Sequence, residues 1–186
     1  MRTVFAKLLI CFGLLFVTAG TASGHVVVAN SAPRLGIPAT RATNPLSPVR
    51  DFDAFGNEIY YRSIPEAHVR ILEETGRLPA TTETSVAALD RYAGSYDGVL
   101  MKFTVKPGTS AQLQEIGIAA PGRAVSEFSG MSTRSEDWVM TNARFKVEGL
   151  RRAGELQMTT QLGRGRALDI FNSNLVHFEP WYLKER

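Results

Sequence analysis

The clearest strand in the sequence is VLMKFTV, residues 99–105. Its apolar side chains occupy alternate positions, at Val99, Met101, Phe103 and Val105. Because successive side chains of an extended chain point to opposite faces, this alternation is typical of a half-buried strand. The Lys-Pro-Gly sequence at 106–108 ends the strand, and a short helix is expected from Thr109 to just before Gly117.

A strand and a helix are also predicted upstream. The run EIYYR at 58–62 is rich in β-branched and aromatic residues and follows a Gly-Asn turn, which indicates a strand. Ser63 then has the position of an N-cap, with Glu66 three residues later closing a capping box and Pro65 in the first turn. Gly76 is placed to end this helix as a C-cap.

The rest of the chain is expected to form mostly strands. Residues 119–136 are rich in Gly, Ser and Arg without periodicity, so a long surface loop is predicted there. Further strands are predicted at 81–87, 143–148, 156–162 and 175–182, with helical turns at 88–93 and 167–171. The order of strand, helix and then mainly strands predicts an α+β domain with a largely antiparallel sheet.

Residues 1–24 have the pattern of a cleavable signal peptide. Arg2 and Lys7 are followed by an uncharged apolar stretch at 8–19 and small residues at 22–24. The apolar stretch is shorter than the ~20 residues of a membrane-spanning helix, so export is favoured over a stable membrane anchor. We therefore expect a secreted protein.

A flexible arm or linker is predicted at 25–55, before a domain at 56–186. The arm has no helical or strand period and contains Pro33, Pro38, Pro45 and Pro48. The domain has the size of a single core.

Composition excludes several classes of function. Cys11, the only cysteine, lies in the predicted signal peptide, so the mature chain cannot form a disulfide framework. The full chain has 21 basic and 18 acidic residues; without Arg2 and Lys7 the mature chain has 19 basic residues, a net charge of +1. This charge does not favour nucleic-acid binding. The three histidines lack metal-ligand spacing, so no metal site is expected.

Two charged residues stand at strand ends. Arg62 follows two tyrosines in the first strand, where a sheet can aim its guanidinium at a phosphate or a nicotinamide-bearing group. Glu148 precedes Gly149, and a glycine lets a substrate backbone or sugar approach closely. Taken alone, each residue is better explained as an ordinary strand-end charge than as a catalytic group.

Several segments, in order along the chain, resemble one known family. They are 59–62, 76–84, 96–103, 142–149 and 162–172. Together they resemble the TreTu-type ADP-ribosyltransferase toxin domain, which occurs at the C-termini of bacterial polymorphic toxins such as Rhs proteins. The resemblance covers about residues 56–178.

The resemblance implies a split, mostly antiparallel β core with short flanking helices that clamps NAD. It implies that Arg62 contacts the dinucleotide and that Glu148 bonds the nicotinamide ribose and stabilises positive charge as nicotinamide leaves. Tyr61, Thr84 and Ser85 are further NAD-binding candidates. The serine position of the family corresponds to Ala87 here, so Ser85 or Thr84 would have to supply that hydroxyl.

The function implied is that of an exported mono-ADP-ribosyltransferase toxin. NAD would be its substrate, and its acceptor a protein of a competing or host cell, with a translation component such as elongation factor Tu as one candidate and an immunity protein as a further partner. Lys146 stands where enzymes that modify arginine usually carry Glu or Gln, which disfavours an arginine acceptor. An NAD glycohydrolase toxin and a catalytically degenerate secreted binding module on the same fold remain alternatives.

Overall fold

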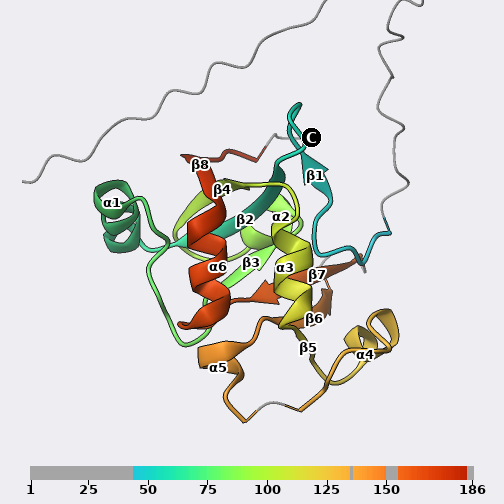
Figure 1. The fold of residues 1–186 in the computed structure, drawn as a ribbon. Coiled ribbons are helices and arrows are strands. Elements are labelled where there is room, and N and C mark those ends of the chain that lie inside the picture. Colours follow the sequence, from blue (N-terminus) through green and yellow to red (C-terminus); the bar gives the residue numbers. More distant parts are fainter. Residues whose placement is uncertain (1–43, 135, 150–154, 184–186) are drawn as a thin grey trace, which may run out of the picture. The chain divides into compact units, whose positions relative to one another are not determined.

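The computed structural model describes residues 44–134, 136–149 and 155–183 (Figure 1). The predicted signal peptide at 1–24 and residues 25–43 of the predicted arm lie outside these ranges. Within them the prediction of an α+β fold is confirmed. In chain order the elements are β1 (Asp51–Phe52), β2 (Glu58–Ile64), α1 (Glu66–Thr75), β3 (Ser85–Ala87), α2 (Asp90–Ala93), β4 (Val99–Val105), α3 (Thr109–Glu115), β5 (Ile118–Ala119), α4 (Arg123–Glu127), α5 (Trp138–Thr141), β6 (Arg144–Gly149), β7 (Leu156–Gln161), α6 (Arg166–Asn174) and β8 (Leu175–Pro180).

The sheet is mostly antiparallel and consists of two halves. Its strand order is β5-β6-β7-β3-β2-β4-β8, with β1 paired to β2, and only the β5–β6 pair is parallel among the described strands. β2 and β4 pair over their full lengths, from Glu58↔Val105 to Ile64↔Val99. β2 and β3 share a single pair, Tyr61↔Ala87. The two halves therefore meet at a short seam between β2 and β3.

One face of the sheet carries the main core. Figure 1 shows α3 and α6 side by side over this face. Leu113 of α3 and Phe171 of α6 are fully buried, and the Phe171 ring packs edge-on against Tyr60 and Phe103 of the sheet. Because α3 and α6 bury their apolar sides in this layer, the core rests on helix-to-sheet packing and needs no disulfide.

A smaller cluster involves α2. Its buried residues are Ile59, Tyr61, Ala87, Tyr92 and Ala93. Trp181, which follows β8, packs against the cluster, and its Nε1 donates a hydrogen bond to Asp90 Oδ2 at 3.1 Å. This cluster holds α2 close to the seam between the sheet halves.

The predicted capping box at the start of α1 is wrong. Ser63 lies in β2, which continues to Ile64, and its Oγ donates to the backbone oxygen of Ala93 at 2.8 Å. Pro65 is the N-cap of α1, and no side chain caps this helix end. The C-cap is confirmed, since Gly76 has the left-handed backbone (φ 66°) that ends such helices.

The predicted arm differs from the structure in its last residues. Leu46 and Val49 are buried, and Asp51–Phe52 pairs with β2 as strand β1. Asp53 shapes the following turn, because its carboxylate accepts hydrogen bonds from the backbone N–H groups of Phe55 and Asn57. Strand β1 has only two residues, too few to display a strand period, which is why the sequence pattern does not reveal it.

The predicted loop at 119–136 is only partly correct. It contains the end of β5 and the short helix α4, with Ala120 and Ala124 buried. β5 pairs in parallel with β6, so Ile118 lies beside Arg144. Two or five residues are too few to display a period, which is why the sequence pattern does not reveal these elements.

Candidate active site

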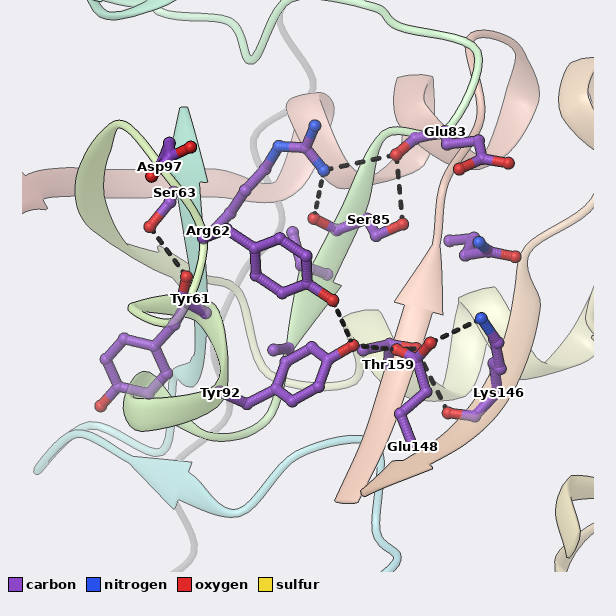
Figure 2. Close-up of a pocket in the computed structure, with 15 residues that line it drawn as sticks. Tyr61, Arg62, Ser63, Glu83, Ser85, Tyr92, Asp97, Lys146, Glu148 and Thr159 are labelled. Atoms are coloured by element: carbon purple, nitrogen blue, oxygen red, sulfur yellow. Dashed lines mark hydrogen bonds and ion pairs between the residues drawn. The ribbon is translucent and has the colours of Figure 1, made fainter. Parts of the chain in front are cut away.

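A cleft of about 510 Å³ opens at the seam between β2 and β3 (Figure 2). Strands β2, β3, β6 and β7 and helix α2 contribute to its walls. The lining residues are Tyr61, Arg62, Ser63, Glu83, Ser85, Val86, Ala87, Tyr92, Ala93, Tyr96, Asp97, Lys146, Glu148, Thr159 and Gln161. The cleft thus brings together Arg62 and Glu148, which lie in different halves of the sheet.

Arg62 reaches across the seam. Its Nη1 donates to the backbone oxygen of Ser85 at 2.5 Å and to that of Glu83 at 3.5 Å. This reach is open because β2 and β3 do not continue their pairing past Tyr61↔Ala87. Burial lowers the pKa of the Arg62 guanidinium, but arginine stays charged at any physiological pH. The result is a fixed cation in the cleft.

Glu148 is the most densely hydrogen-bonded side chain of the cleft. Its Oε2 accepts from the Tyr92 hydroxyl at 2.5 Å and from Thr159 Oγ1 at 3.0 Å. Its Oε1 lies 2.5 Å from Lys146 Nζ, two residues earlier on β6. These three contacts hold the carboxylate firmly. The Glu148 side chain is still 21% exposed, so the carboxylate is accessible to a ligand.

These contacts determine the charge of Glu148. Burial raises the pKa of this carboxyl, while hydrogen bonds from Lys146, Tyr92 and Thr159 and the charge of Lys146 lower it, and the net shift is downward. Glu148 is therefore ionised at neutral pH, because donors that favour the charged form outweigh desolvation. An ionised carboxylate can accept hydrogen bonds from sugar hydroxyls and can stabilise a nearby positive charge.

Two tyrosines that the sequence analysis did not single out complete this side of the cleft. The hydroxyls of Tyr92 and Tyr96 lie 2.7 Å apart, and their rings pack edge-on. Burial and the hydrogen bond to Glu148 raise the pKa of Tyr92, which keeps its proton. Tyr96 lies beyond the end of α2 at Ala93, so no helical spacing in the sequence indicates that the two rings meet.

Of the predicted NAD contacts, Ser85 lines the cleft and Thr84 does not. Thr84 is fully buried, and its hydroxyl accepts from the backbone N–H of Thr81 at 2.7 Å within the preceding turn. Ala87 also lines the cleft and pairs with Thr159 across β3 and β7. Since residues 85 and 87 lie on one side of β3, Ser85 has the hydroxyl on that strand that is nearest to the family's serine position.

Tyr61 contributes mainly through packing. Figure 2 shows its ring directed away from Glu148. Its hydroxyl donates to Asp51 Oδ2 at 3.1 Å, and its ring centroid lies 5.9 Å from that of Trp181. Tyr61 is among the residues that line the cleft, and its predicted contact with NAD stays a prediction.

Two other classes of site are not seen in the described part of the chain. No group of three or more His, Cys, Asp or Glu side chains there is arranged to hold a metal ion. None of the helices described is long and apolar enough to cross a membrane. Arg164 and Arg166, two exposed arginines at the turn before α6 and at its first residue, do not line the cleft.

Comparison with protein families gives one match. The family model described as the PT3 toxin domain matches residues 56–180, from just before β2 to the end of β8. The matched region includes every residue that lines the cleft. A search of curated proteins found no match to the chain.

Proposed function

The chain belongs to the PT3 toxin domain family, and we propose that it is an exported mono-ADP-ribosyltransferase toxin that uses NAD as substrate. The observation that carries the proposal is the meeting of Arg62 and Glu148 in one cleft, from the two halves of the sheet. The resemblance to the TreTu-type domain assigns these two residues to NAD binding and to catalysis.

The residues of the cleft fit NAD at both ends. Arg62 uses Nη1 for two backbone carbonyls, and a guanidinium has five N–H donors, so others remain for the pyrophosphate. Glu148 offers an ionised carboxylate to the hydroxyls of a ribose. Ser85, Tyr96 and Gln161 line the same cleft and add hydrogen-bonding groups along it.

The chemistry proposed for Glu148 is electrostatic. NAD supplies a C–N glycosidic bond whose electron pair leaves with nicotinamide, while the ADP-ribose carbon bonds to a nucleophile of the acceptor, which loses a proton. Glu148 would stabilise the positive charge that develops on the sugar, as carboxylates do in glycoside cleavage. Three donors from three elements hold the carboxylate before the substrate arrives, which lowers the reorganisation that the reaction requires.

The acceptor proposed is a protein of a competing or host cell, with a translation component such as elongation factor Tu as the first candidate. Modification of such a target would inhibit translation. The producing cell would be protected by export of the toxin and by an immunity protein. If residues 1–24 direct export, N-terminal sequencing of protein collected outside the producing cells gives His25 as the first residue.

The proposed activity can be tested with the chain that lacks residues 1–24, labelled NAD and a bacterial lysate. We expect nicotinamide release and a labelled protein, both lost in Glu148→Gln. Glu115→Gln is the matched control, because Glu115 is exposed at the end of α3 and does not line the cleft. Nicotinamide release without a labelled acceptor would indicate a glycohydrolase, and absence of both NAD binding and release would indicate a binding module.

A further inference from the structure

The Tyr92 hydroxyl lies between Glu148 Oε2, at 2.5 Å, and the Tyr96 hydroxyl, at 2.7 Å. An ionised carboxylate only accepts hydrogen bonds, and a hydroxyl has a single proton. Tyr92 therefore donates to Glu148, and Tyr96 donates to Tyr92. The two tyrosines form a directed chain that leads from the exposed Tyr96 to the partly buried carboxylate.

Helix α2, which carries Tyr92, is anchored by contacts that do not involve Glu148. Asp90 accepts from the Trp181 indole at 3.1 Å, and Arg91 forms an ion pair with Glu155 just before β7. The Ala93 backbone oxygen accepts from Ser63 Oγ of β2 at 2.8 Å. Three separate parts of the fold thus hold α2 and fix the position of the Tyr92 hydroxyl. The hydrogen bond from this hydroxyl therefore restricts the orientation of the Glu148 side chain.

The other two partners of Glu148 hold it less firmly. Lys146 is on the same strand, and its side chain is 45% exposed, where an ion pair contributes little. Thr159 shares its hydroxyl with the backbone oxygen of Lys146, at 3.2 Å. Among the described contacts of Glu148, the one from Tyr92 is the only one that is both short and made by a buried side chain.

We propose that Tyr92 is the positioning residue of this cleft, which holds the Glu148 carboxylate in one orientation as an ionised acceptor and leaves Oε1 at the accessible side with Lys146. The catalytic effect of this positioning, on the cleavage of NAD, rests on the proposed function. The groups that favour the ionised form of Glu148 are Lys146 from β6, Tyr92 from α2 and the hydroxyl of Thr159 from β7, with Tyr96 behind Tyr92. Arg62, Glu83 and Asp97 are the other charged residues that line the cleft.

The variant Tyr92→Phe removes one oxygen atom and keeps the ring in its cluster. We expect kcat for nicotinamide release to fall about tenfold to a hundredfold, the range that a hydrogen bond to a charged group supplies, with KM little changed. We also expect the acid limb of the pH–rate profile to move to higher pH, because the carboxylate loses a donor that favours its charged form.

The titration of Glu148 can be followed without any activity, by carbon-13 NMR of glutamate side-chain carboxyls, with the signal assigned from its loss in Glu148→Gln. We expect Glu148 to titrate at higher pH in Tyr92→Phe than in the wild type, and Tyr96→Phe to give a smaller shift in the same direction. Tyr60→Phe is the matched control, because this fully buried tyrosine contacts Glu58, which does not line the cleft.

The outcomes separate the two proposals. An unchanged Glu148 titration in Tyr92→Phe overturns the positioning role, whether or not the protein cleaves NAD. If the Glu148 titration shifts in Tyr92→Phe but the wild-type protein does not cleave NAD, the proposed function is overturned and the positioning role is supported. An equal shift of the Glu148 signal in Tyr60→Phe would mean that loss of any buried hydroxyl disturbs the site, which also overturns the positioning role.

Discussion

Arg62 Nη1 donates a hydrogen bond of 2.5 Å to the backbone oxygen of Ser85, across the seam where the two halves of the sheet share one residue pair. The Arg62 side chain thus donates a hydrogen bond to a β3 carbonyl that a backbone N–H of the neighbouring strand would donate in a regular sheet. Since the carbonyl groups of Ser85 and Glu83 orient the guanidinium, the charge is in place before any ligand binds.

Arg62→Lys is expected to weaken NAD binding about tenfold or more. The guanidinium can bond two backbone carbonyls and still present N–H donors to a phosphate, because it has five donors in a planar fork. A lysine ammonium lacks this fork. Isothermal titration with NAD measures the effect, and Arg70→Lys, an exposed arginine of α1, is the control. Equal affinity of Arg62→Lys and the wild type would contradict the role of the guanidinium.

Ser85→Ala and Thr84→Val are expected to differ in kind. Ser85 lines the cleft, so its loss should lower the rate of NAD cleavage. Thr84 is buried with its hydroxyl bonded to Thr81, so its loss should lower the free energy of unfolding by about 1–2 kcal/mol. Steady-state kinetics and urea denaturation on both variants check this, and a reversed pattern would place the functional hydroxyl at residue 84.

The free energy of unfolding should depend on Glu148 in a defined pH range. Its folded-state pKa lies below the ordinary value of 4.5, so its contribution is complete above that value and is lost as the pH falls through the folded-state pKa. We therefore expect the difference in stability between wild type and Glu148→Gln to be constant from pH 5 to 7 and to shrink in more acidic buffer. Urea denaturation at several pH values measures it, and a difference that grows on acidification would contradict the assignment.

Glu58→Gln is expected to destabilise the fold by about 2–3 kcal/mol. The buried Glu58 carboxylate accepts from the backbone N–H of Gly108 at 3.0 Å and from the N–H and hydroxyl of Ser110 at 2.7 and 2.8 Å. A glutamine would turn an amide donor toward one of these donors and would lose the negative charge at the start of α3. Thermal and urea denaturation test this, with the exposed Glu115→Gln expected to stay within about 0.5 kcal/mol of the wild type.

Gly163→Ala is expected to be strongly destabilising, whereas Gly130→Ala is not. Gly163 has φ 60°, and a Cβ there would collide with the backbone oxygen of Val139 in α5. A Cβ at Gly130 would meet no atom within 4 Å. We expect a loss of about 2 kcal/mol or more for Gly163→Ala, measured by urea denaturation. Similar stability of the two variants would mean that α5 can move away from the turn.

Local patterns were enough to predict much of the fold. The alternation in β4, the aromatic run of β2 and the glycine that ends α1 each depend on a few neighbouring residues, and the structure confirms all three. Arg62 and Glu148 stood out for a similar reason, because each ends a strand that the sequence pattern predicts, although β2 continues to Ile64 and β6 to Gly149. The capping box was wrong because Ser63 finds its partner thirty residues away, in Ala93.

Sequence by itself therefore determined the longer strands and helices, the α+β class and two charged residues whose side chains could bind NAD. Only the tertiary structure decided that these residues share a cleft and that Tyr92 and Thr159 hold Glu148 there. The physical reason is that these contacts depend on strand register and on the anchoring of α2, both of which arise from packing between distant segments. A period of two or of 3.6 residues describes which way a side chain points, but not which side chain of another element it meets.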